Sequence, residues 1–200
     1  MAAGKVLTGF SLPYVALYSL TQGAVVYSSG QKLARGVSVS LEVESSDDNK
    51  FHADNVIAEN VSGVFTSGTC TLTVDGLKNE AEKLIMGLPT PTEETIGTET
   101  VDIYHYGDGV SVPYVGIGFI ARYQEEGAIT YRPVVLPKCM FNTPSLEAAT
   151  QEEEIEWQTQ ELVANILRDD TTNHDWKLIG EDQTTEAKAE AVIKSLFSIS

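Results

Sequence analysis

The chain has 200 residues, 42% of them hydrophobic, which suffices for one substantial core but not easily for two ordinary domains. Its 29 Asp and Glu residues outnumber its 13 Lys and Arg residues, so the formal net charge is −16. Proteins that bind nucleic-acid phosphates do so mainly through Lys and Arg, and this charge balance therefore argues against such binding.

The sequence has no apolar run of about 18 residues, the length that crosses a bilayer as a helix. Residues 1–7 also lack the long apolar stretch of a secretory signal. We therefore expect the protein to be made and folded in a cytoplasm. Cys70 and Cys139 are too few for a disulfide scaffold or a zinc cluster. We expect two reduced, buried thiols, with a bridge between them as the alternative.

The first part of the chain is rich in strand patterns. Leu12–Leu20 and Gly23–Tyr27 carry β-branched and aromatic side chains and predict two early strands. Ser28–Gly36 is predicted to be a loop. Val37–Glu44 then alternates apolar and polar residues, the pattern of a strand with one buried face.

A long hairpin is predicted over Val37–Val74, with Val37–Glu44 as its outgoing arm. The polar run Ser45–Asn49 is predicted to form its acidic tip, because such side chains bond to their own backbone and favour turns. The return arm contains Phe51–Val56 and the alternating residues of Thr69–Val74. This hairpin is expected to project from the rest of the fold.

Helical spacing replaces alternation after Val74. Asp75 is predicted to cap a short amphipathic helix, and Gly87 with Pro89 is predicted to end it. A helix of about three turns is marginal alone in water, so it is expected to flank a sheet. The apolar side of this flanking helix comprises Leu77, Ala81, Leu84, Ile85 and Leu88.

A polar loop is predicted from residue 89 to residue 100, followed by a strand at Val101–Tyr106. The longest strand pattern lies at Pro113–Gln124, and Glu125–Gly127 is predicted as the turn to a hairpin partner at Thr130–Leu136. One face of the long strand is expected to carry Val115, Ile117, Phe119 and Ala121.

The next segments give a less uniform pattern. Lys138–Phe141 is short and strand-like. In Thr150–Arg168 an alternating pattern competes with helix-favouring Glu, Gln and Ala. We favour a strand as far as Val163, with a helix as the alternative. On a strand, alternate polar residues would project to one side and call for a water-filled neighbour. These residues are Glu152, Glu154, Glu156, Gln158 and Gln160.

The last part of the chain is predicted to contain a strand at Trp176–Ile179 and a helix at Thr185–Phe197, capped by the Thr at 184 or 185. The apolar face of this helix comprises Ala189, Val192, Ile193 and Leu196. We therefore expect one mainly β domain over residues 1–180 and a C-terminal helical extension at residues 181–200.

No motif predicts a catalytic, cofactor or metal site. Gly116–Ala121 matches a dinucleotide fingerprint only in its glycines, because that motif needs a helix start and this segment has a strand pattern. The three histidines are scattered singly, without the spacing of a ligand set. A loose calcium-like set of oxygens, for which a solvated loop is the alternative, occurs at Asp169, Asp170, Asn173 and Asp175.

Two other function classes are compatible with the sequence. A carboxylate hydrolase would use two of the glutamates, such as Glu154 and Glu156, as acid and base. A β-sandwich carbohydrate-binding or adhesion module would stack sugars on aromatic rings. The candidate rings are Tyr104, Tyr106, Tyr114, Trp157 and Trp176.

Four stretches of the chain resemble the major tail tube proteins of long-tailed bacteriophages, especially those with non-contractile tails. These stretches are Asn49–Asn55, Gly68–Leu77, Tyr114–Lys138 and Thr150–Leu162. The resemblance is one of overall pattern across much of residues 37–163, and none of the stretches is a catalytic signature. The part after Trp176 has no counterpart in it.

The resemblance implies an antiparallel β-sandwich or barrel with a flanking helix, assembled into hexameric rings that stack into a tube. DNA would pass through the tube during ejection without specific binding, since an acidic lining repels phosphate. The implied partners are further copies of the chain, a tape measure protein inside the tube, and tail terminator and distal tail proteins at its ends. The implied location is the virion tail, assembled in the cytoplasm of a host bacterium.

Two sets of residues and the flanking helix have roles in this hypothesis. The candidates for the lumen-facing wall are Glu152, Glu154, Glu156, Gln158 and Gln160. The helix at Leu77–Leu88 is expected either outside the ring or simply over its own sheet. The projecting hairpin is expected to reach the next ring or a neighbouring subunit by edge pairing. The candidates for this contact are Ser46, Asp47, Asp48, Asn49, Lys50, Phe51, His52 and Asp54.

Overall fold

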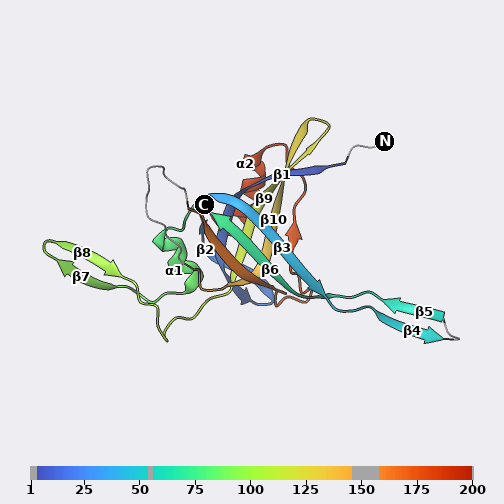
Figure 1. Ribbon diagram of the computed structural model, residues 1–200, viewed down its shortest axis with the longest axis horizontal. Helices are drawn as coiled ribbons and strands as arrows, with labels where there is room; N and C mark the ends of the chain where they lie inside the picture. Colours follow the sequence, from blue (N-terminus) through green and yellow to red (C-terminus); the bar gives the residue numbers. More distant parts are fainter. Residues whose placement is uncertain (1–3, 54–55, 146–157, 200) are drawn as a thin grey trace.

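The computed structural model describes residues 4–53, 56–145 and 158–199 (Figure 1). An eight-stranded antiparallel sheet has the order β2-β1-β9-β10-β11-β6-β3, and β12 pairs with β10. Its strands are β1 (Val6–Thr21), β2 (Ala24–Lys32), β3 (Gly36–Ser45), β6 (Phe65–Val74), β9 (Val115–Glu125), β10 (Ala128–Phe141), β11 (Gln160–Leu167) and β12 (Leu178–Ile179). The expected mainly β, antiparallel fold is confirmed.

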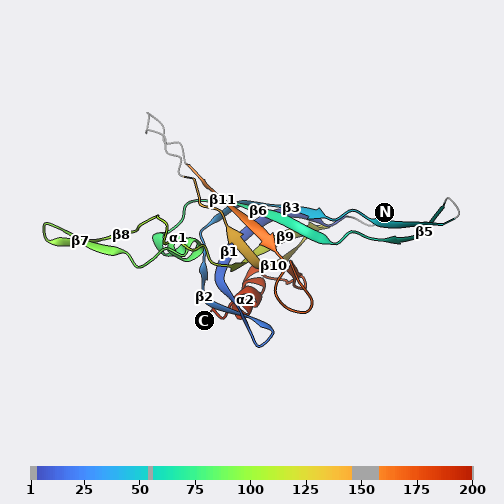
Figure 2. The same ribbon diagram turned by 90° about the horizontal axis from the view of Figure 1, so that it is seen from below.

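The sheet folds over on itself into two layers (Figures 1 and 2). One layer contains β2, β1, β9 and β10, and the other contains β11, β6 and β3. Strand β10 joins them, because its register with β9 shifts between Leu136 and Cys139, and Lys138–Phe141 then pairs with β11. Pro137, which has no N–H to donate, occupies this irregularity. The chain thereby passes between layers without ending a strand.

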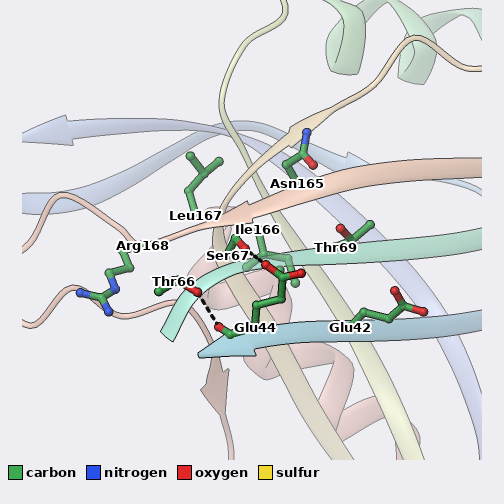
Figure 3. A pocket seen from close by; sticks show the side chains of 10 residues that line it. Glu42, Glu44, Thr66, Ser67, Thr69, Asn165, Ile166, Leu167 and Arg168 are labelled. Carbon is green, nitrogen blue, oxygen red and sulfur yellow. Dashed lines mark hydrogen bonds between the residues drawn. The ribbon is translucent and has the colours of Figure 1, made fainter. Parts of the chain in front are cut away.

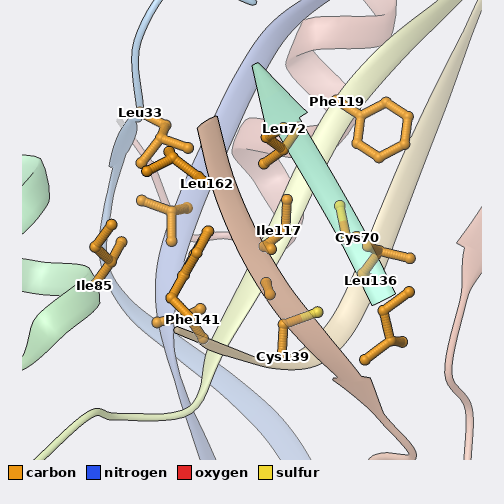
Figure 4. Close-up of a cluster of buried hydrophobic side chains, with 14 of the residues drawn as sticks. Leu33, Cys70, Leu72, Ile85, Ile117, Phe119, Leu136, Cys139, Phe141 and Leu162 are labelled. Carbon is orange, nitrogen blue, oxygen red and sulfur yellow. The ribbon is translucent and has the colours of Figure 1, made fainter. Parts of the chain in front are cut away.

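The main core fills the space between the layers (Figure 4). Ile117 projects into it from one layer and Leu72 from the other. Cys70 and Cys139 are fully buried there as free thiols, which confirms the prediction of two reduced, buried cysteines. Burial raises the pKa of Cys70 to about 12 and also raises that of Cys139, so both thiols remain protonated.

Helix α1 (Asn79–Met86) packs against this core, which confirms the predicted flanking helix. Its buried side chains include Met86, which the predicted apolar stripe omitted. Gly87 ends the helix in the left-handed conformation (φ 61°), as expected. The other residues of the predicted stripe are buried or half-buried: Leu77, Ala81, Leu84, Ile85 and Leu88.

The prediction that Asp75 caps α1 is wrong. The carboxylate of Asp75 accepts hydrogen bonds from the backbone N–H and Nε of Arg35. Lys78 occupies the N-cap position and makes no side-chain hydrogen bond to the helix. Asp75 therefore joins the end of β6 to the segment before β3, and the bonds from Arg35 lower its pKa.

Helix α2 (Glu186–Leu196) covers the outer face of the layer that contains β9, on the side of the molecule away from β3, β6 and β11 (Figure 2). Thr185 caps it by accepting a hydrogen bond from the Lys188 N–H (3.4 Å), as expected. The buried stripe consists of Ala189, Ile193 and Phe197. Leu196, which was expected in this stripe, is exposed. Residues 181–200 thus include a helix packed directly on the sheet.

Two glycines of β9, Gly116 and Gly118, allow the side chains of α2 and its C-terminal end to pack closely on the strand. A Cβ atom on Gly118 would lie 2.7 Å from Ile193 Cγ2, and one on Gly116 would lie 2.5 Å from the Tyr27 ring. Phe197 is 3.0 Å from both of these positions. The glycines of Gly116–Ala121 therefore make room for packed side chains, in keeping with the strand pattern that argued against a nucleotide motif.

The predicted projecting hairpin exists, but its turn is not at Ser45–Asn49. The arms β3 and β6 continue outward as β4 (Asn49–Ala53) and β5 (Val56–Val61), a separate two-stranded sheet. The polar side chains do bind backbone, as expected, but on the opposite arm. Ser46 Oγ accepts from the Val64 N–H and Asp48 Oδ1 from the Gly63 N–H, each at 3.0 Å. Residues 54–55, between the two strands, lie outside the described part.

Two predicted loops contain strands. Strand β2 runs on to Lys32 and β3 begins at Gly36, so only residues 33–35 of the predicted loop Ser28–Gly36 lie outside strands. The predicted polar loop from 89 to 100 contains β7 (Thr92–Ile96) and the start of β8 (Glu99–Ile103), which pair as a second hairpin. Neither strand of this hairpin buries a face against the body, so its sequence lacks a strong apolar signal.

The predicted strand in Thr150–Arg168 lies partly inside and partly outside the described residues. Strand is confirmed over Gln160–Val163 and continues to Leu167, so the helical alternative is wrong there. Residues 150–157 lie outside the described part. The expected strand Trp176–Ile179 is reduced to Leu178–Ile179. Among described helices, neither α1 nor α2 is long and apolar enough to span a bilayer.

We expect the substitution Gly118→Ala to destabilise the protein by about 1–3 kcal/mol, because its methyl group would overpack Ile193 and Phe197, which are fully buried. Urea unfolding would measure this loss. Gly107→Ala is the matched control, since a Cβ there meets nothing within 4 Å, and we expect it to change stability by less than about 0.5 kcal/mol. Equal effects of the two substitutions would contradict this role of Gly118.

Candidate functional site

The outer face of β3, β6 and β11 is polar, and we call it the polar face. Cross-strand pairing sets its side chains in rows, because paired residues project to the same side of a sheet. Thr73 lies between Ser38 and Glu161 in one such row. The next two rows are Ser40, Thr71 and Val163, and then Glu42, Thr69 and Asn165.

Hydrogen bonds between side chains order this polar face. Ser38 Oγ donates to Thr73 Oγ1 at 2.9 Å, and Ser67 Oγ donates to Glu44 Oε2 at 2.8 Å. Figure 3 shows a shallow groove of about 540 Å³ where Glu42 and Glu44 lie beside hydroxyl groups of β6. Hydroxyls and carboxylates line the β3 and β6 side of this groove, and Ile166, Leu167 and Arg168 line its β11 side.

All the charged residues of these three strands are carboxylates: Glu42, Glu44 and Glu161. The nearest cation along β11 is Arg168, just beyond its end, whose guanidinium donates to the backbone carbonyl of Phe65. None of the described helices covers this side of the molecule, whereas α2 covers the opposite layer (Figure 2). The polar face is therefore an open, negatively charged surface.

The predicted wall residues meet this face only in part. Glu152, Glu154 and Glu156 lie outside the described residues, and Gln158 is exposed just before β11. Gln160 pairs with the buried Val74, so it projects toward the core side, and its Oε1 accepts from the Leu77 N–H at 3.1 Å. The expectation that Gln160 belongs to an open polar face is wrong by one residue of register.

The residues that do occupy the polar face were missed as site candidates. On β11 they are the odd-numbered Glu161, Val163 and Asn165, and on β3 and β6 they are Ser, Thr and Glu residues. The alternation of apolar and polar residues in Thr69–Val74 and Val37–Glu44 indicates this face. Its polar residues were interpreted only as the solvent-exposed side of a strand, not as a functional surface.

The β4–β5 hairpin extends away from the body at one end of the molecule (Figures 1 and 2). Of the predicted contact residues, Asn49, Lys50, Phe51 and His52 belong to β4. Ser46, Asp47 and Asp48 form the link between β3 and β4, and Asp54 lies outside the described residues. The structure therefore places the described contact candidates on one projecting ribbon, most of them before its tip.

The β7–β8 hairpin extends from the other end, beyond α1 (Figures 1 and 2). Every residue of both strands is exposed. Ile96 pairs with Glu99 across a two-residue turn that begins at Gly97, whose φ of 69° suits glycine. A two-stranded hairpin without a covering partner is marginally stable in water. This ribbon is therefore a candidate contact surface that the sequence did not reveal.

The oxygen-rich loop after β11 is held by its own hydrogen bonds. Asp169 is buried, and its Oδ1 accepts from the N–H groups of Thr171 (3.1 Å) and Asp175 (3.0 Å). Asp170 binds Lys138 Nζ at 2.8 Å and Tyr18 Oη at 3.0 Å. Within the described residues, no group of three or more His, Cys, Asp or Glu side chains could hold a metal ion.

The described aromatic candidates for sugar stacking are dispersed. Trp176 stacks on Phe65 at the start of β6, with ring centroids 4.7 Å apart. Tyr106 donates a hydrogen bond to Glu82 of α1. Helix α1 comes after the end of β6, whereas Phe65 is at the start of that strand. Tyr104 packs partly against the main core, Tyr114 lies under Lys138 Nζ at 4.4 Å, and Trp157 lies outside the described residues. These rings do not line a common surface.

No protein-family model matches the chain, and no curated protein matches it.

We expect the substitution Asp170→Asn to destabilise the protein at pH 7 by about 1 kcal/mol, since it removes the partner of the mostly buried Lys138, while Asp170 itself is half exposed. Lys138 lowers the pKa of Asp170, so the stabilisation is present above the ordinary Asp pKa of about 3.9 and lost as the pH falls through the lower folded-state value.

Urea unfolding at several pH values would measure the difference between this variant and the original protein. The difference is expected to shrink below about pH 4. Asp108→Asn, in an exposed loop, is the matched control and should leave stability unchanged. A difference that persists unchanged to low pH would show that the ion pair is not its cause.

Proposed function

We propose that this protein is a structural subunit that assembles into a tube, of the kind formed by the tail tube proteins of long-tailed bacteriophages. In this proposal six copies form a ring, rings stack, and the chain has no catalytic role. The observation that carries the proposal is the open polar face, which has carboxylates and hydroxyls on its three strands and no Lys or Arg.

The polar face is suited to line the bore of such a tube. Glu42, Glu44 and Glu161 would repel the phosphates of DNA, and counterion release, which drives proteins onto DNA, requires the cations that these strands lack. The hydroxyl groups between the carboxylates keep the wall wetted. DNA would therefore pass without lasting contact during ejection.

The opposite layer is suited to the outside of the ring. Helix α2 covers it, and side chains of α2 fill the space above β9. The strand order also ends at β2 and β3, so each of these strands has one edge that pairs with no other described strand. Pairing of such edges between copies would join the polar faces into one continuous inner wall.

The two projecting hairpins supply contacts that a lone copy leaves unmade. They extend in opposite directions from the body (Figure 1), so each can reach a different neighbour. We assign the β4–β5 hairpin, with Asn49–Ala53, to the contact with the next ring or neighbouring subunit. A tape measure protein inside the tube, and tail terminator and distal tail proteins at its ends, complete the proposed virion tail, which is assembled in a bacterial cytoplasm.

We expect the purified protein to form rings or tubes by negative-stain electron microscopy at high concentration. Deleting residues 49–61, the β4–β5 sheet, should abolish long tubes and leave the thermal transition of the subunit unchanged, because this sheet pairs with no other described strand. A purified protein that stays monomeric would contradict the proposed function. Normal tubes from the deletion variant would contradict only the role of this hairpin.

Labelling of cysteine variants would test which face lines the bore. Cys70 and Cys139 are fully buried and should not react, so Ser40→Cys on the polar face would supply a reactive thiol. In tubes we expect this thiol to react with a small maleimide but not with a polymer-linked one, which cannot enter the bore. Ser195→Cys on α2 is the control and should react with both reagents.

Equal reaction of the polymer-linked reagent with both variants in assembled tubes would place the polar face outside the bore. That result would contradict the proposed orientation of the subunit.

A further inference from the structure

The β7–β8 hairpin is amphipathic. Its pairing register sets Thr92, Glu94, Ile96, Glu99, Val101 and Ile103 on one side and Glu93, Thr95, Thr100 and Asp102 on the other. All three of its apolar side chains therefore share one face. The exposed fractions are 67% for Ile96, 40% for Val101 and 39% for Ile103. An apolar face of this kind is stabilised by a covering partner, and the hairpin extends away from its own body (Figures 1 and 2).

A groove of suitable character lies elsewhere on the subunit. It has a volume of about 240 Å³ and lies between the start of β1, strand β3 and strand β12. Phe10, Leu41 and Phe119 contribute to its apolar lining, and the exposed side chains of Leu7 and Ile179 lie at its mouth. The groove can thus accept aliphatic side chains from a partner.

The charges of the hairpin and the groove are complementary. Residues 92–103 of the hairpin contain four carboxylates and no Lys or Arg. Glu94 and Glu99 lie on its apolar face, directly opposite Val101 and Ile96. The charged residues that line the groove are Arg132 and Lys177, both cations. Arg132 is already ion-paired with Asp182 at 2.8 Å, so the complementary charge comes mainly from Lys177. The carboxylates of the hairpin and the cation Lys177 of the groove attract each other, whereas two hairpins, both acidic, repel each other.

The hairpin and the groove face different neighbours. The hairpin lies beyond α1 at one end of the long axis, whereas the start of β1 runs toward the other end (Figures 1 and 2). A copy therefore cannot fill its own groove with its own hairpin. A contact between unlike surfaces of two copies is head-to-tail, and repetition of such a contact generates a ring or a filament.

We propose that the apolar face of the β7–β8 hairpin of one copy docks in the groove between β1, β3 and β12 of a second copy. This inference rests on the self-assembly proposed above and names the surfaces that carry it. Ile96 and Val101 enter the apolar groove, and Glu99 meets Lys177 at its rim. Docking converts a solvent-exposed ribbon into a covered one.

Disulfide cross-linking of mixed variants tests the contact. One sample carries Ile96→Cys and the other Leu7→Cys, both at exposed positions, while the native thiols are buried. Mixed under mild oxidation at about 10 μM, they should give a reducible dimer of twice 21.7 kDa. Thiols held in a contact have an effective concentration in the millimolar range, so cross-linking should exceed random collision by on the order of 100-fold.

Glu93→Cys is the matched control, since it lies on the same strand but on the opposite face of the hairpin. With Leu7→Cys it should give only the random level of dimer. A mixed Ile96→Cys and Leu7→Cys sample at that same level would overturn the docking. So would predominant dimers of Ile96→Cys alone, which would mean that hairpins pair with each other.

Electron microscopy of the same samples separates the two proposals. Tubes without the mixed cross-link would overturn the docking and leave the tube function standing, whereas monomers without it would overturn both. Charge reversal gives a second measurement: Glu99→Lys should reduce assembly several-fold, and adding Lys177→Glu on the groove side should restore it. Failure of the double reversal to restore assembly would overturn the charge pairing at the rim.

Discussion

Strand β9 is buried on both of its faces, and this constraint determines which surface of the molecule stays open. Its odd-numbered residues from Val115 to Ala121 belong to the main core, whereas Ile120 and the neighbouring glycines face α2. A strand buried on both sides needs a covering layer on each. The second sheet layer covers one side and α2 covers the other. The outer face of β3, β6 and β11 is then left for water or for whatever fills the proposed bore.

The surfaces that remain open differ in character. Several side chains of the polar face are hydrogen-bonded to one another, and the charged residues of its three strands are all carboxylates, so it suits a surface that does not hold a polyanion. The β7–β8 hairpin instead exposes aliphatic side chains, and the edges of the sheet expose backbone groups. Covering these surfaces lowers the free energy of the protein, because apolar side chains leave water and edge backbone groups find partners. The subunit thus combines an open polar face with projecting hairpins and sheet edges left unpaired by the described strands, the combination that the proposed polymer with a clear bore requires.

Much of the fold could be predicted because periodicity reports burial. The alternation of Val115 to Ala121 marked the side of β9 that faces the main core, and the helical spacing around Ile85 and Ile193 marked the buried sides of α1 and α2. Predictions failed where a side chain had a choice of partner. Asp75 was a plausible helix cap but binds Arg35, and the polar residues after Ser45 bind the opposite arm instead of closing a turn.

The candidate site was predicted less well than the fold. The β7–β8 hairpin was missed because its apolar face has only three members, which the described residues leave exposed. Gln160 was placed on the wrong side because an alternating pattern does not say which of its two sets is the buried one. Only the pairing of Gln160 with Val74 decides that question. The projecting β4–β5 ribbon was anticipated from its arms, but its length depended on pairings that sequence periodicity does not contain.

The burial of Cys70 and Cys139 determines how the proposed polymer would respond to oxidation outside a cell. With the pKa of Cys70 raised to about 12 and Cys139 buried beside it in the same core, almost no thiolate is available at neutral pH. Disulfide exchange and oxidation proceed through the thiolate. In the proposed polymer, these buried thiols would form no covalent bonds between subunits when the particle passes from a reducing cell interior into aerated water.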